Sequence, residues 1–411
     1  MTIERVGVAG EAVLGRSELA SEVAGACAGG GRLAGLFGSP RRDGSVELRA
    51  VLAVPGGYRT LGTRLPAGDL SHPSISSAVP AASWYERELH DLYGVESTGH
   101  PRLDPLVFPS PASAPRPAIA GSARPLDPDP LALSAHASGE GMFTIPYGPV
   151  RSGVFESVEY LVETFGEDIP RLRSRVHHKH RGVGSRFPAL TPADGVLLAE
   201  RVEGTVSVAH AVAYCRAIEE LTGTVVPVEA ELVRLVHAEI ERIVNHLDSM
   251  IRHTEGSYQV VANARLAVHK ERLMRLRSAM CANRFGRGVA VPGGVSGPLR
   301  IPPESARRTL SDIARAVAAD VSALMVTPSF LDRLRKTGPL PPQVVAEHGA
   351  VGPVGRGRRP TGLSRRAPRQ GRHPAADLGP PRCRLPVPRL RLCGTVHPPP
   401  GELVAAFPPP R

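Results

Sequence analysis

Residues Trp84–Phe108 read "WYERELHDLYGVESTGHPRLDPLVF" and decide the fold expected for the first part of the chain. The residues up to Tyr93 favour a charged helix, Gly94 closes it, and "GHP" indicates a tight turn. Nearer the start of the chain, "SELASEVAGACAGG" has the Ser cap and final glycines of a helix. "RLAGLFGS" and "VELRAVLAVPGG" have strand patterns. Residues 1–108 are therefore predicted to form a small α/β domain, in a chain of α+β class.

A proline-rich linker and a helical block are predicted next. Residues 109–140 contain too many prolines near their start for regular structure, and residues 141–355 are dominated by helical periodicity. "SVAHAVAYCRAIEELTG" predicts a helix that stops at Gly223, and "PVEAELVRLVHAEIERIVNHLDSMIRH" predicts one that starts at Pro227. The expected apolar stripe of the second helix consists of Leu232, Val236, Ile240, Ile243, Leu247 and Met250. We expect a mainly α-helical domain of bundle type.

The formal net charge of +11 is concentrated in the last 56 residues. Residues 356–411 contain twelve Arg, thirteen Pro and two acidic residues, which leaves the preceding part nearly neutral. The composition of the main part therefore makes no case for nucleic acid as a partner. The tail has neither helical nor strand periodicity and is expected to be disordered. Its Arg/Pro/Gly bias is also typical of GC-rich DNA translated out of frame, so we hypothesise a frameshift near codon 356.

The five cysteines are far apart and contain no C-x-x-C pair. This spacing predicts neither a disulfide framework nor a zinc ribbon, and a reducing compartment is the natural setting. The first thirty residues lack the apolar core of a signal peptide, and no apolar run approaches the roughly 20 residues that span a bilayer. We expect a soluble chain without a membrane span.

The order of residues in Trp84–Phe108 resembles the signature of the small hydrophilic subunit of respiratory complex I, which also occurs in formate hydrogenlyase large subunits. In that family the segment docks subunits and performs no chemistry. The resemblance therefore implies an interface formed by Glu86, Arg87, Glu88, Asp91, Tyr93 and His100.

The helical block resembles the complex I core subunit that is homologous to [NiFe]-hydrogenase large subunits. The motifs that carry this resemblance, in family order, are "YGPVRSG", "HKHRG", "ERVEGTVSVAHAVAY", "AELVRLVHAEIERIVNHL" and "RFGRGVAVPGGV". A fusion of both modules is typical of the formate hydrogenlyase large subunit (group 4 [NiFe]-hydrogenase) family. The resemblance implies this family, and it covers about residues 70–355.

The metal ligands of that family are missing from the motif. The family has R-V-C-G-x-C here, and this chain keeps Arg201, Val202 and Gly204 but has Glu203 and Val206 at the cysteine positions. A nickel-iron pair needs soft thiolates, which a carboxylate and an isopropyl group cannot replace. The second cysteine pair is also absent, so no [NiFe] centre is expected.

Complex I holds a quinone headgroup in the same cavity. The resemblance places its histidine position at Arg151 or Ser152 and its tyrosine position at Gly204, so neither ligand is kept and the case for quinone is weak. We expect no cofactor on this chain, with the iron–sulfur cluster in a partner subunit. Glu203, Arg201 and His180 are candidate relay residues, and for Arg201 and Glu203, as a buried pair, a structural role is favoured over a relay role.

Three other patterns are assigned to structure rather than chemistry. His177, His178 and His180 alternate, but a surface or hydrogen-bonded role is favoured over a metal site. Glu239, Arg242 and His246 share a helical face and are interpreted as packing and ion-pair residues. "GRGVAVPGGVSG" is not G-x-G-x-x-G, so dinucleotide binding by this loop is not expected, and NADH binds a different subunit of complex I.

The resemblance implies a subunit of a formate hydrogenlyase-like or NADH:quinone oxidoreductase-like complex, active in electron transfer coupled to proton movement. Its expected partners are an iron–sulfur subunit and integral membrane subunits, which would hold it on the cytoplasmic face of the plasma membrane. The competing interpretation is a non-catalytic assembly subunit or a truncated remnant of such a complex.

Overall fold

The computed structural model describes residues 9–55, 57–107, 141–149, 157–175, 180–335, 337–350 and 354. The chain divides into two compact units. The first holds the described residues up to His180 together with those from Leu340 on, and the second holds Arg181–Pro339. The predicted linker and tail lie outside the described residues. The predicted domain boundaries at 108 and 141 remain predictions.

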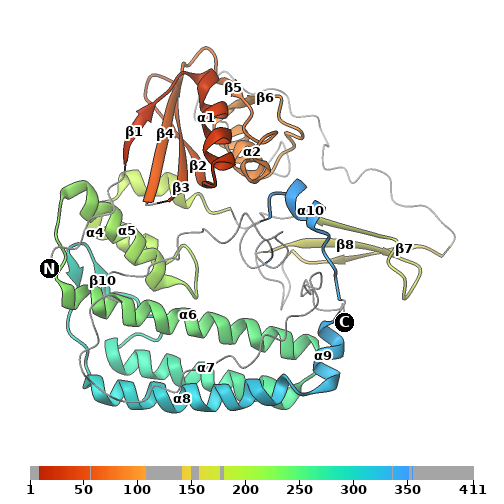
Figure 1. Ribbon diagram of the computed structural model, residues 1–411, viewed down its shortest axis with the longest axis vertical. Helices are drawn as coiled ribbons and strands as arrows, with labels where there is room; N and C mark the ends of the chain where they lie inside the picture. Colours follow the sequence, from red (N-terminus) through yellow and green to blue (C-terminus); the bar gives the residue numbers. More distant parts are fainter. Residues whose placement is uncertain are drawn as a thin grey trace. The chain divides into compact units, whose positions relative to one another are not determined.

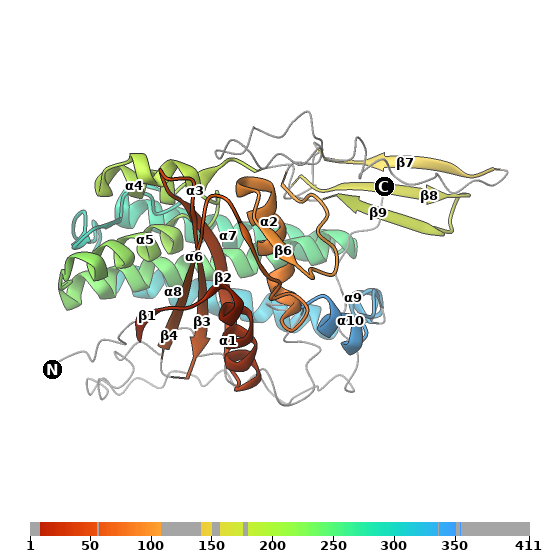
Figure 2. The ribbon, with the colours of Figure 1, turned by 90° about the horizontal axis from the view of Figure 1, so that it is seen from above.

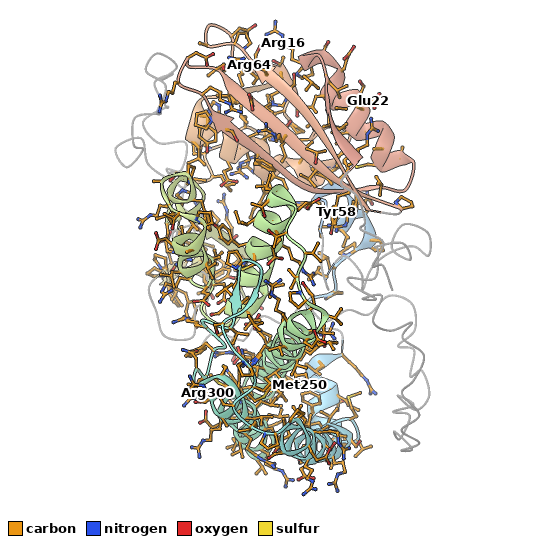
Figure 3. All side chains as sticks on the ribbon, turned by 90° about the vertical axis from the view of Figure 1, so that its left-hand side faces the viewer. Arg16, Glu22, Tyr58, Arg64, Met250 and Arg300 are labelled. Atoms are coloured by element: carbon orange, nitrogen blue, oxygen red, sulfur yellow. The ribbon has the colours of Figure 1, made fainter. Side chains whose placement is uncertain are left out.

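A four-stranded sheet with the order β1-β4-β3-β2 is the centre of the first unit. β4 and β2 both pair antiparallel with β3, and β1 pairs parallel with β4. The strands are β1 (Ala9–Val13), β2 (Arg32–Pro40), β3 (Val46–Val54) and β4 (Gly57–Leu65). Burial alternates along most of β3, because successive side chains of a strand point to opposite faces. Figure 3 shows Tyr58 and Arg64 at opposite ends of β4.

Two helices, α1 (Arg16–Ala28) and α2 (Ser83–Tyr93), pack against this sheet (Figure 1). Leu19 of α1 and Leu89 of α2 are buried in the same apolar core as the strand residues. Gly94 ends α2 at φ +68, so the helix stop predicted from the sequence is confirmed. The remaining elements of this part are β5 (Ser71–Pro73), η1 (Pro80–Ala82), β6 (Glu96–Thr98) and α10 (Pro342–Glu347).

A separate antiparallel sheet groups with the first unit. Its order is β7-β8-β9, and its strands are β7 (Phe143–Tyr147), β8 (Glu159–Thr164) and β9 (Arg171–Arg175).

The second unit is mainly helical, which confirms the predicted α+β class with a helical second part. Its long helices α6, α7 and α8 lie alongside one another (Figure 1 and Figure 2), with a shared apolar core that includes Leu247, Leu273 and Ile313. The helices are α3 (Val183–Arg186), α4 (Pro192–Ala199), α5 (Ser207–Thr222), α6 (Val228–Gly256), α7 (Val260–Cys281), α8 (Pro303–Leu324) and α9 (Pro328–Leu334). The other elements are η3 (Phe187–Ala189), β10 (Ala290–Val291) and β11 (Gly294–Val295).

The apolar stripe predicted for α6 is only half correct. Ile240 and Leu247 are buried, but Leu232, Val236 and Ile243 are exposed. The buried face of α6 instead includes charged and titratable residues, which apolar periodicity cannot detect. These polar residues are Arg234, His237, Glu241 and Thr254.

No single helix within the described residues has the length and apolar composition needed to span a bilayer. The bent pair α8 and α9, at 78° to each other, meets that requirement only when the two are taken together.

Candidate functional site

The elbow between α4 and α5, Glu200–Val206, does not hold the buried Arg201–Glu203 pair that the motif predicts. Arg201 is 53% exposed, and its Nη1 donates to the Leu197 carbonyl at 2.6 Å. Its ion pair, at 3.9 Å, is with Glu200. The guanidinium turns back because the last carbonyls of α4 have no partner within the helix and attract a cation. The expectation of a buried pair is therefore wrong, and a relay role for Arg201 remains a prediction.

Glu203 stabilises the turn that leads into α5. Its carboxylate accepts the Thr205 N–H at 2.7 Å and the Thr205 hydroxyl at 2.9 Å. Asn245 of α6 donates to the Thr205 carbonyl at 3.3 Å, and Arg181 donates to the carbonyls of the residues before Glu203. Gly204 is exposed, and a Cβ added there would meet nothing within 4 Å. The elbow is thus held by hydrogen bonds.

The donor groups at the elbow do not suit a nickel-iron pair. Glu203 is engaged by its own turn, and Val206 offers only a half-buried isopropyl group. The described cysteine that lies in α5, Cys215, is buried, and burial raises the pKa of its thiol to about 11, which disfavours the thiolate. No group of three or more His, Cys, Asp or Glu among the described residues is arranged to hold a metal ion.

A buried carboxylate contacts the first residues of α5. Glu241 of α6 is 2% exposed, and its oxygens accept the N–H groups of Val208 at 2.7 Å and Ala209 at 2.9 Å. Arg277 of α7, also 2% exposed, lies 3.7 Å from Glu241 Oε2. Burial raises the pKa of the Glu241 carboxyl, and the two N–H groups and the guanidinium oppose this shift only in part.

His237 lies one turn before Glu241 on α6 and is 1% exposed. Its Nδ1 and Arg277 Nε are both buried without a hydrogen-bond partner among the described residues. Burial, helped by the nearby Arg277 charge, lowers the pKa of His237 to about 4. The imidazole is therefore neutral at neutral pH.

A second buried charge network fastens α6 to the β10–β11 hairpin. Arg234 is 1% exposed and donates to both carboxylate oxygens of Glu219, at 2.5 and 3.1 Å. It also donates to the carbonyls of Val291 at 2.7 Å and Gly294 at 2.9 Å, while Glu219 accepts the Gly293 N–H. We assign these contacts a structural role, because the buried polar atoms of Arg234 and Glu219 find their hydrogen-bond partners within the network.

A largely apolar groove of about 620 Å³ lies beside this network, at the start of α6. Its lining includes Pro227, Ala230, Val233, Gly294, Leu299 and Ile301, and none of the relay or cavity residues predicted from the sequence.

In the first unit, Glu86 connects α2 to the loop before it. Its fully buried carboxylate accepts Ser74 Oγ at 2.8 Å, the Ile75 N–H at 2.7 Å, and both the N–H and the hydroxyl of Ser76. His100 Nε2 lies 3.8 Å from Glu86 Oε2. Glu86 and His100 therefore direct their polar atoms into the unit itself.

Arg87 and Asp91 hold the segment that follows β6. Arg87 donates to the carbonyls of Asp104 at 2.7 Å and Pro105 at 2.9 Å, and Asp91 accepts the N–H groups of the next two residues at 2.8 and 2.7 Å. These two side chains therefore hold the loop in place by hydrogen bonds within the first unit.

Glu88 and Tyr93 are half-buried on α2. Burial raises the pKa of the Glu88 carboxyl, and the nearby His180 opposes that shift. Burial, together with the Glu88 charge, also raises the pKa of Tyr93. His180 is exposed, and its relay role and the interface role of this motif remain predictions.

Several predicted positions lie outside the described residues, namely Arg151, Ser152, His177 and His178. Glu239 and Arg242 form the ion pair predicted for α6, on its exposed face, and His246 is also exposed.

Sequence reasoning missed His237, Glu241 and Arg277. The available signal was their spacing, because His237 and Glu241 share a helical face with the buried Ile240 and Val244. Helical periodicity that counts only apolar residues does not register it.

The domain described as "Respiratory-chain NADH dehydrogenase, 30 Kd subunit" matches residues 41–117. The chain is 31% identical over 241 residues to the membrane-bound hydrogenase subunit alpha of Pyrococcus furiosus, which covers 57% of this chain and 55% of that protein. It is 26% identical to formate hydrogenlyase subunit 5 of Escherichia coli, over 79% of this chain and 60% of the relative.

It is also 25% identical to the C/D subunit of the NADH-quinone oxidoreductase of Pseudomonas paraeruginosa, over 51% of this chain and 39% of the relative. The chain thus spans at most 60% of the length of these three relatives. Both halves of the resemblance inferred from the motifs are confirmed, because the matched domain contains Trp84–Phe108 and the relatives carry the hydrogenase and complex I names. The chain is therefore a homologue of formate hydrogenlyase subunit 5, membrane-bound hydrogenase subunit alpha and the C/D subunit of NADH-quinone oxidoreductase, and its residues 41–117 match the 30 kDa-subunit domain of respiratory-chain NADH dehydrogenase.

Proposed function

We propose that this chain is a subunit of a formate hydrogenlyase-like or NADH:quinone oxidoreductase-like complex, in electron transfer coupled to proton movement, without a [NiFe] centre of its own. The observation that carries the proposal is the elbow. Hydrogen bonds hold its turn and the start of α5, while Glu203 and Val206 occupy the positions at which the family has thiolates. The homology supplies the class of complex.

In this function the electrons travel through an iron–sulfur cluster of a partner subunit, and no step runs through a metal or quinone on this chain. Its own residues hold structure and protons. Among the candidate relay groups, Glu203 is the one whose charge contributes to raising the pKa of the buried Glu241. Integral membrane partners would hold the chain at the cytoplasmic face of the membrane.

A non-catalytic assembly subunit or remnant is the second candidate. The observation in its favour is that Glu86, Arg87 and Asp91 of the docking motif direct their hydrogen bonds inward, which stabilises the unit without any partner. The presence of partner subunits separates the proposed function from that of a remnant.

Purification of the tagged chain from its native host in mild detergent tests the proposal, with the untagged host as the control. We expect iron–sulfur and membrane subunits to co-purify in fixed ratio, identified by mass spectrometry. A chain recovered alone would overturn the proposal in favour of a remnant. Metal analysis of the same sample should find iron without nickel, and stoichiometric nickel would contradict the interpretation of the elbow.

A further inference from the structure

Three buried titratable or charged side chains, His237, Glu241 and Arg277, form a cluster next to the start of α5. His237 and Glu241 lie on one face of α6, four residues apart, which places their Cβ atoms about 5–6 Å from each other. Arg277 reaches them from α7. Their exposed fractions are 1%, 2% and 2%, respectively.

The carboxylate of Glu241 is subject to two opposed effects. The N–H groups of Val208 and Ala209, at 2.7 and 2.9 Å, and the positive end of α5 favour its ionised form. Its guanidinium neighbour is 3.7 Å away, beyond hydrogen-bond distance, and burial favours the neutral form. A carboxyl in this balance can change protonation state in response to a modest change in nearby charge.

Two further polar atoms at this cluster have no hydrogen-bond partner among the described residues. His237 Nδ1 and Arg277 Nε are both buried in this way. Leaving a buried polar atom unpaired costs about 1–3 kcal/mol, so a purely structural cluster would gain nothing from these two open positions. An imidazole with an open ring nitrogen, one turn from a carboxyl, is suited to passing a proton to it.

We propose that Glu241 is a proton-accepting group of this subunit, charge-compensated by Arg277 and supplied with its proton through His237. The step is a proton transfer alone: a hydronium ion of the solvent protonates the His237 ring and leaves water, the N–H bond of the ring then breaks as the O–H bond of Glu241 forms, and no electron is transferred. The other charged or titratable groups that face the cluster are Glu203 from the elbow and Cys281 from α7. The biological use of this proton site rests on the proposed function, whereas its existence is a property of this chain.

The alternative is that Glu241 only caps α5. The two interpretations differ in how the proton reaches Glu241. A carboxyl that only caps α5 does not need His237 for its protonation, whereas the proposed path runs through the open ring nitrogen of His237.

Infrared titration of the intact chain tests whether Glu241 takes up a proton. We expect the carbonyl stretch of a protonated carboxyl to appear at a pH above the ordinary pKa of Glu, about 4.3. Because burial also raises the pKa of Glu88, the titration is done in a Glu88→Gln background, where that band should be lost on adding Glu241→Gln and retained on adding Glu239→Gln, whose carboxylate is exposed on the same helix. Titration of the band at or below the ordinary value, or its persistence in Glu241→Gln, would overturn the proposal.

Two further variants test the roles of the neighbours. Arg277→Gln removes a charge that lowers the pKa of Glu241, so its midpoint should move upward, and Arg277→Lys should shift it less. If Arg277→Gln does not fold, His237→Leu still provides a test. After a rapid pH drop, His237→Leu should slow the appearance of the band by roughly tenfold or more with little change in midpoint, and an unchanged rate would remove His237 from the path. These measurements need no partner subunit, so their failure is distinct from a failed co-purification.

Discussion

Replacing Glu86 with leucine should destabilise the first unit by about 3 kcal/mol. The buried carboxylate accepts hydrogen bonds from Ser74, Ile75 and Ser76, and leucine can accept none of them. Leaving the buried Ile75 N–H without this acceptor should lower the free energy of unfolding by about 1–3 kcal/mol. The serine hydroxyls can rotate and the Ser76 N–H also reaches Ser74 Oγ at 3.1 Å, so we assign the donors other than Ile75 a smaller loss.

The chain's single tryptophan makes this measurable in the full-length protein. Trp84 lies on α2, two residues before Glu86, so its fluorescence follows the unfolding of the first unit. With a urea dependence of about 1–3 kcal/mol per M, a loss of about 3 kcal/mol lowers the unfolding midpoint by roughly 1–3 M.

Glu86→Gln is the matched control. Its amide oxygen can still accept the Ile75 N–H, and its NH₂ group can donate to the serine hydroxyls, so we expect a loss of only about 1 kcal/mol. Equal midpoints for Glu86→Leu and the wild-type chain would refute the reasoning, since they would mean that these donors are satisfied without the carboxylate.

Three other substitutions test the second unit. Arg234→Met removes the buried ion-pair partner of the Glu219 carboxylate, which keeps the Gly293 N–H as a donor, and should cost about 3–5 kcal/mol in urea unfolding followed by circular dichroism; a loss below about 1 kcal/mol would contradict it. Because the pKa of His237 falls from 6.5 to about 4 on folding, the unfolded chain binds the extra proton between these values and stability decreases as the pH falls through them, by about 2–4 kcal/mol. His237→Leu should flatten that part of the pH profile, and an unaltered slope would assign it to other groups. Gly286 has φ +70, and a Cβ there would lie 2.5 Å from a Val208 side-chain carbon, so Gly286→Ala should lower the calorimetric Tm, and an unchanged Tm would contradict the predicted clash.

The ends of the helices can be predicted from the sequence, but the polar interior cannot. Gly94 and Gly223 both end helices at positive φ, as their positions after amphipathic stretches predict, because glycine adopts this conformation without steric cost. The buried positions of Arg234, His237 and Glu241 depend on partners far away in the sequence, such as Glu219 and Arg277, which no local pattern reveals.

The elbow shows the same division between local and distant causes. The helix that follows it is apparent from the sequence, because the apolar residues from Val208 on have helical spacing and stop at Gly223. The outward turn of Arg201 is not, because it depends on which carbonyls at the end of α4 remain open.

The persistence of the elbow without thiolates follows from where its supports lie. Glu241 and Asn245 of α6 hold the start of α5 and the turn before it, and Arg181 holds the backbone on the other side. None of these contacts involves the two positions at which the family has cysteine. Replacement of the two cysteines is therefore compatible with the fold of the elbow, because its supports come from α6 and from Arg181.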